Sequence, residues 1–182
     1  MREVAQEERS GLGLNDHEPL DPYALAREHG IPVYTLSDLR DHDLEPDALD
    51  HFHGASTSSW SAALIPFDTA RIIVENDAHS LVRRRSNIAH ELGHHLLEHS
   101  FDNVILGEDH KRQFDTHQEK QAKFMSGELL IPDKAARRAA YDNWDNAQVA
   151  RAFAVSEQFA QMRMYGARVI AERAAKKFGI SR

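Results

Sequence analysis

Cysteine is absent from this sequence of 182 residues. The chain therefore forms no disulfide, and a metal site in it must use histidine, aspartate or glutamate as ligands. Long apolar runs are also missing, since none approaches the roughly 20 residues that a membrane-spanning helix needs. The first residues, MREVAQEERSGLGL, lack the continuous apolar core of a secretory signal. We therefore expect a cytoplasmic protein that is not anchored in a membrane.

An excess of positive charge is missing as well. Lysine and arginine together number 22 and aspartate and glutamate 29, so the formal net charge is −7. A chain of this charge has no overall electrostatic attraction to the phosphate backbone of nucleic acids. Direct binding of nucleic acid is therefore not expected. Hydrophobic residues make up 41% of the chain, which is enough for one globular domain with a sizeable core.

The order of the expected elements indicates an α+β fold. Residues 1–19 show no apolar period and are predicted to form a flexible N-terminal segment, followed by a single domain over residues 20–182. A first helix is predicted to begin at Asp21, with Pro22 at its first position, and to end at Gly30. The strands come before the remaining helices instead of alternating with them, which favours α+β over α/β.

Apolar patterning predicts the later elements. Ala62–Ile65 and Arg71–Glu75 are predicted to be short strands that form a hairpin. Helices are then predicted over residues 81–100 and 116–130, and the C-terminal part, residues 133–182, is predicted to be helical. Within it, VARAFAVSEQFAQMRMYG has the form of a helix-turn-helix, but its apolar side chains favour a packing face or a platform for a protein partner.

The stretch AHELGHHLLEH, residues 89–99, contains four histidines and two glutamates. His90, Glu91 and His94 fit the pattern H-E-x-x-H. On a helix, residues i and i+4 lie on one face, so the imidazoles of His90 and His94 can bind one metal ion. Glu91 lies beside them and can take a proton from a water molecule on that ion. The stretch therefore predicts a hydrolytic metal site.

His95 and His99 form a second pair at helical spacing. Leu96 follows His95, so no base stands where this pair would need one. His95 also lies about 100° around a helix from His94. We expect both histidines to be solvent-exposed or to support the site from outside the ligand set.

A catalytic zinc usually has three protein ligands. Leu97 and Ser100 exclude the extended pattern H-E-x-x-H-x-x-G-x-x-H, so the third ligand must come from later in the chain. Spacing alone leaves five candidates, which are His110, Asp115, His117, Glu119 and Glu128.

A resemblance to a known family selects one of them. EKQAKFMSGELLIP, residues 119–132, together with RRRSNIAHELGHHLLEH upstream, resembles the ImmA/IrrE family of intracellular zinc metallopeptidases. The family pattern E-x-x-A-x-x-F-A-x-x-L-L-x-P is matched at Glu119, Ala122, Leu129, Leu130 and Pro132, with Met125 and Ser126 as departures. The likeness covers roughly residues 20–166 and implies a zincin-like fold, in which a small sheet or hairpin precedes the HExxH helix and a helical part follows.

The same resemblance implies the site and the function. His90, His94 and Glu119 would be the ligands of zinc (Zn2+), and Glu91 the catalytic base. Members of the family act on helix-turn-helix repressors, often encoded beside them. The implied activity is a zinc-dependent endopeptidase that cleaves such a repressor, of a phage, mobile element, toxin–antitoxin pair or stress response, and so relieves repression. The alternative is a binding partner that sequesters or displaces a repressor or antitoxin without cleaving it, with a structural zinc.

One further expectation concerns the three arginines at positions 83–85. Cations at the start of a helix oppose its dipole. At least one of these arginines is therefore expected to have a carboxylate partner elsewhere in the fold.

Overall fold

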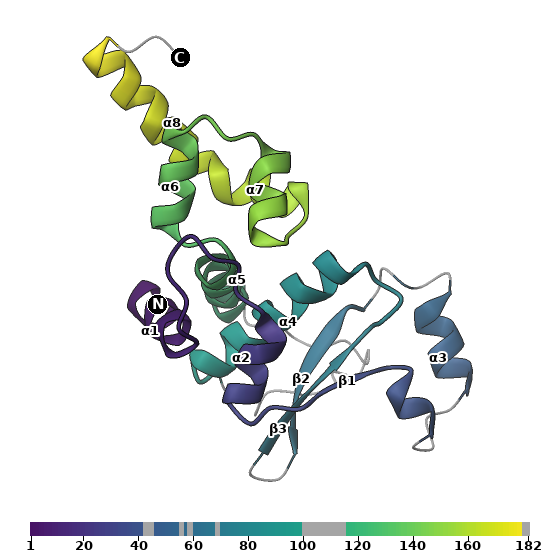
Figure 1. Ribbon diagram of the computed structural model, residues 1–182. Helices are drawn as coiled ribbons and strands as arrows, with labels where there is room; N and C mark the ends of the chain where they lie inside the picture. The colour runs from purple at the N-terminus through teal and green to yellow at the C-terminus, as the bar shows by residue number, and fades with distance from the viewer. Residues whose placement is uncertain (42–45, 55–56, 58–59, 68–69, 100–115, 180–182) are drawn as a thin grey trace. The chain divides into compact units, whose positions relative to one another are not determined.

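The computed structural model describes residues 1–41, 46–54, 57, 60–67, 70–99 and 116–179 (Figure 1). Its elements confirm the predicted α+β fold, with a small three-stranded sheet ahead of a mostly helical C-terminal part. The elements in chain order are α1 (Arg2–Gly11), α2 (Pro22–Glu28), β1 (Val33–Thr35), η1 (Asp38–Asp41), α3 (Pro46–His53), β2 (Ala62–Phe67), β3 (Ala70–Glu75), α4 (Leu81–Leu96), α5 (Thr116–Leu130), α6 (Asp133–Tyr141), α7 (Asn146–Phe153) and α8 (Glu157–Phe178).

The chain forms two compact units. The first comprises Met1 and Asp21–Ser126, and the second comprises Arg2–Leu20 and Gly127–Arg182. The single domain predicted over residues 20–182 stays a prediction. Within the described residues, no helix combines the length and the apolar character needed to cross a membrane.

The sheet of the first unit has the strand order β1-β3-β2. β2 and β3 form the predicted antiparallel hairpin, with Leu64 opposite Ile73, and both side chains are fully buried. β1 pairs with β3 in parallel and was not expected from the sequence, because three residues are too few to show an alternating pattern. Helix α4 packs against β2, β3 and α2.

Local signals account for the start of α2. The side chain of Asp21 accepts a hydrogen bond from the backbone N–H of Tyr23, and Pro22 occupies the first turn, as predicted. The end of α4 differs from the prediction. The helix was predicted to reach residue 100 but ends at Leu96, because the chain turns back at Glu98 with φ of 52°.

In the second unit, α6 and α7 pack against α8. Asp145 and Gln148 form a capping box at the start of α7, and Ser156 caps α8. Phe153, Val155 and Met164 are buried, as expected of a packing face, whereas Met162 is 41% exposed. These features explain the predicted helical C-terminal part from local sequence.

The N-terminal segment of the second unit differs from the expectation. Residues 1–19 were predicted to be flexible, whereas the structure has helix α1 there, and the side chain of Arg9 in it is fully buried. The guanidinium of Arg9 donates to the carbonyl oxygens of Leu129, Asn15 and Glu18. Hydrogen bonds from a buried arginine to backbone carbonyls leave no apolar period in the sequence. Hydrophobic patterning therefore could not predict that helix α1 forms and packs within residues 1–19.

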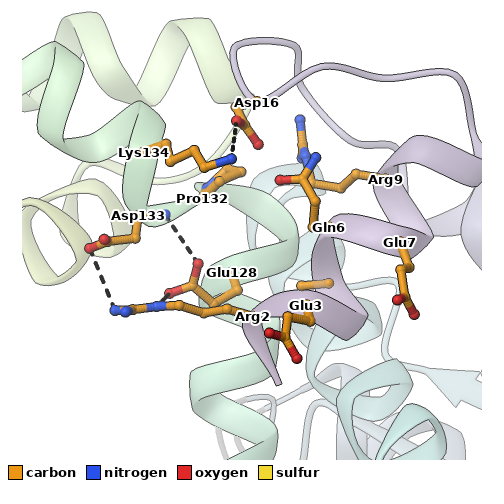
Figure 2. Close-up of a pocket in the computed structure, with 11 residues that line it drawn as sticks. Arg2, Glu3, Gln6, Glu7, Arg9, Asp16, Glu128, Pro132, Asp133 and Lys134 are labelled. Carbon is orange, nitrogen blue, oxygen red and sulfur yellow. Dashed lines mark hydrogen bonds and ion pairs between the residues drawn. The ribbon is translucent and has the colours of Figure 1, made fainter.

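A cavity of about 470 Å³ lies in the second unit (Figure 2). Around it, Glu128 accepts hydrogen bonds from Arg2 and from the backbone N–H of Asp133, and Lys134 pairs with Asp16. The lining carries charges of both signs, and ion pairs join Arg2 to Glu128 and Asp133.

Candidate metal centre

The two motif histidines lie on α4, which is fixed to its unit by apolar side chains. Ile88 and Leu92 are fully buried, as the predicted helical spacing requires. His94 is 8% exposed, and the side chain of His90 is 28% exposed. The helix therefore buries one side and presents two imidazoles at the edge of its buried surface.

Glu119 on α5 meets these imidazoles. The Nε2 atom of His90 lies 3.2 Å from Glu119 Oε2, and the Nε2 atom of His94 lies 3.3 Å from Glu119 Oε1. The two Nε2 atoms are 3.2 Å apart, and one ligand atom from each residue falls within 4.8 Å of the others. The structure thus brings together the three residues that the family resemblance implies as ligands, here named the metal cluster.

A glycine allows α4 and α5 to approach at this point. A Cβ atom built on Gly93 would lie 2.8 Å from the carbonyl oxygen of Ala122 and 3.3 Å from Cβ of Met125. Any other residue at position 93 would push α5 away, and Glu119 lies on that helix. Gly93 was not identified from the sequence, because its neighbours come from a distant segment.

The donor set suits a cation. Two imidazole nitrogens and a carboxylate oxygen are the ligands of many catalytic zinc sites. Burial lowers the pKa of His90 below its ordinary value, while the Glu119 carboxylate opposes that shift. A lowered pKa keeps the imidazole neutral, and the neutral form is the one that binds metal.

Glu91 follows His90 on α4, and its side chain contacts the sheet. Its Oε2 atom accepts a hydrogen bond of 2.9 Å from the backbone N–H of Leu64 on β2. The carboxylate is therefore oriented by the sheet. The Leu64 donor was missed by the sequence reasoning, because a backbone contact leaves no side-chain signal.

The four other candidates for the third metal ligand are not members of the metal cluster in the described residues. His110 and Asp115 lie outside the described residues. His117 is exposed in the first turn of α5. Glu128 is 4% exposed and is bound by Arg163 at 2.9 Å and by Arg2 at 3.3 Å.

The two additional histidines of the motif differ from each other. His95 Nδ1 lies 3.0 Å from Arg71 NH1, and its ring meets that of His29 edge-on. His99 is buried, and its Nδ1 atom lies 3.0 Å from His94 Nδ1. His99 therefore supports a member of the metal cluster, and His95 faces another set of groups.

The arginines at the start of α4 have the expected partners. Arg84 pairs with the buried Glu75 at 2.5 Å, and Arg85 lies 3.6 Å from Asp21. The hydroxyl of Tyr23 also donates to Glu75, and burial together with that carboxylate raises the pKa of Tyr23 to about 12. This network ties the first turns of α4 to β3 and α2, so the predicted carboxylate partner is confirmed.

An α+β fold in which two helices bring together two imidazoles and a carboxylate has the ligand types that metallopeptidases use. Comparison with protein families agrees. Residues 26–165 match the model of the peptidase family described as the IrrE N-terminal-like domain, and the chain belongs to that family. A search of curated proteins and a search of solved structures found no match. The predicted family is thus confirmed, and family membership supports a peptidase acting on a protein substrate.

Proposed function

We propose that this chain is a zinc-dependent endopeptidase that hydrolyses a peptide bond in a helix-turn-helix transcriptional repressor and so relieves repression. The observation that carries the proposal is the convergence of His90, His94 and Glu119. Glu91, the next residue after His90, accepts a hydrogen bond from the N–H of Leu64. Two histidines and a glutamate are a common ligand set of zinc peptidases, which supports zinc as the metal.

Each residue has a separate task in this proposal. His90, His94 and Glu119 would hold the zinc ion, which when bound polarises the scissile carbonyl and lowers the pKa of a water molecule. The carboxylate of Glu91 takes a proton from the attacking water and passes it to the nitrogen of the leaving amine. The hydrogen bond from Leu64 holds one oxygen of Glu91 and so fixes the direction in which the carboxylate faces.

The choice of a repressor as substrate rests on the resemblance to the ImmA/IrrE family and on charge. With a formal net charge of −7, the chain has no overall attraction to the operator DNA itself. A repressor encoded beside this protein is therefore the substrate to test.

The test is cleavage of that repressor by purified protein carrying about one zinc per chain. Glu91→Gln should keep the zinc and lower the cleavage rate by about 10²–10⁴-fold, the usual contribution of a positioned base. Glu172→Gln, the same change at an exposed position of α8, is the matched control and should cleave normally.

Two results would contradict the proposal. Normal cleavage by Glu91→Gln would remove Glu91 as the base. A repressor that is displaced from its operator intact, with no fragment formed, would favour the alternative, a binding partner with a structural zinc.

A further inference from the structure

The end of α4 folds His99 back onto His94. The backbone N–H of Glu98 donates to the carbonyl of His95, and that of His99 donates to the carbonyl of His94, both at 3.0 Å. Glu98 between them has φ of 52°. These are the two hydrogen bonds of a Schellman helix end, in which the left-handed position is usually taken by glycine. A glutamate in that conformation is unfavourable, so the surrounding contacts must hold the turn.

Side-chain contacts continue from this turn. His99 Nδ1 lies 3.0 Å from His94 Nδ1, and the two rings are 5.0 Å apart at an angle of 73°. The other nitrogen of His99, Nε2, lies 3.2 Å from Oε1 of Gln121 on α5. Gln121, His99 and His94 thus form a chain of contacts that ends at the metal cluster.

The positions of the protons follow from the chemistry of each group. His94 Nε2 faces Glu119 and His90, so as a metal ligand His94 needs its lone pair on Nε2 and its proton on Nδ1. An N–H···N bond between neutral rings has one donor and one acceptor, so His99 Nδ1 accepts and His99 carries its proton on Nε2. That proton points to Oε1, the side-chain amide oxygen of Gln121, which can only accept.

The neighbouring His95 has the opposite arrangement. The guanidinium of Arg71 always donates, so the Nδ1 atom of His95 accepts and its proton lies on Nε2. Consecutive histidines on one helix are therefore held in different tautomers, and only the tautomer of His94 leaves Nε2 available to a metal.

We propose that His99 and Gln121 are positioning residues that fix His94 in the tautomer with its proton on Nδ1 and thereby raise the affinity of the cluster for a divalent cation. The inference rests on the proposed role of His94 as a metal ligand. Partners of this kind, which bind the far nitrogen of a ligating histidine, typically change metal affinity by about 10–100-fold.

Zinc affinity, measured by competition with a chromophoric chelator, tests this with matched pairs of variants. Leucine and asparagine have similar shapes, but only asparagine offers an acceptor near the position of Nδ1. His99→Leu should weaken zinc binding about 10–100-fold, and His99→Asn should restore most of the affinity. Gln121→Met and Gln121→Glu form a second pair, in which only glutamate keeps an acceptor. His95→Leu is the control and should leave zinc affinity unchanged.

Nitrogen-15 NMR of the histidines in the zinc-loaded wild-type protein gives a readout that does not depend on any variant. The expected spectrum has a proton on Nδ1 of His94 and on Nε2 of His99. A proton on Nδ1 of His99, or equal zinc affinity in His99→Leu and wild type, would overturn the inference while leaving the proposed function in place. Failure of the wild-type protein to bind zinc would instead overturn the proposed function.

Discussion

Two glutamates of helix α5 lie in contrasting surroundings. The side chain of Glu119 is 33% exposed and meets two imidazoles, at 3.2 and 3.3 Å. Glu128 is 4% exposed and meets the guanidinium groups of Arg163 and Arg2, together with the backbone N–H of Asp133. We refer to Glu128 with these partners as the Glu128 cluster.

The difference lies in the neighbours of each carboxylate. A guanidinium is a permanent cation without a lone pair, so it neutralises Glu128 and cannot share a metal ion with it. A neutral imidazole offers a lone pair, so His90 and His94 can share a metal ion with Glu119. One helix therefore carries a carboxylate suited to binding a cation and another that is already neutralised.

The largest expected effect is on the metal cluster. Glu119→Ala should lower zinc affinity by more than about 100-fold, because the loss of a ligand exceeds the 10–100-fold effect of losing an outer partner. The free energy of unfolding of the metal-free protein should change by less than about 0.5 kcal/mol, as expected for a partly exposed site. Unchanged metal content, measured by elemental analysis, would remove Glu119 from the ligand set.

The same kind of change in the Glu128 cluster should act on stability instead. Glu128→Gln leaves the guanidinium of Arg163, which is 14% exposed, without its carboxylate. The unfolding free energy, measured in denaturant, should fall by about 3–5 kcal/mol. Zinc affinity should stay within a few-fold of wild type. A large loss of zinc affinity with an unchanged free energy of unfolding would show that Glu128 acts on the metal site and not on stability.

The two arginines of the Glu128 cluster provide a graded test. Arg163 also donates from Nε and NH2 to the carbonyl of Ile131. Arg163→Lys should therefore lower the free energy of unfolding by about 1–3 kcal/mol. Arg2 is 57% exposed, so Arg2→Lys should cost about 1 kcal/mol or less. Equal losses in the two variants, in the same denaturation experiment, would show that burial does not set the contribution of each arginine.

The smallest effect concerns His79, a histidine outside both clusters. Burial lowers the pKa of His79, the carbonyl of Trp60 opposes the shift, and Arg83 adds to it. Its contribution to stability is therefore complete above about pH 6.5, the value for an unfolded chain, and declines as the pH falls below it. His79→Gln should flatten the dependence of the unfolding free energy on pH between about 5 and 7. If the unfolding free energy of the variant changes with pH as steeply as that of the wild type, His79 is not the source of this pH dependence.

The sequence predicted the elements whose signals are local. The extent of α5, the β2–β3 hairpin and the cap of α2 at Asp21 follow from periodicity and from residues adjacent in the chain. Helix α1 was missed because it is held by Arg9, whose acceptors include the carbonyl of Leu129. The turn after α4 was missed because glutamate rarely takes the left-handed conformation found at Glu98.

The sequence by itself determined that His90 and His94 share one face with Glu91 beside them, because the pitch of a helix fixes that arrangement locally. Spacing could not choose between Glu119 and Glu128, although the family resemblance could. Only the tertiary structure decided which groups surround each of them, because α4 and α5 approach where Gly93 has no side chain, and two guanidiniums enclose Glu128. It also decided the support of His94 by His99 and Gln121, since that contact depends on a chain reversal and on a second helix.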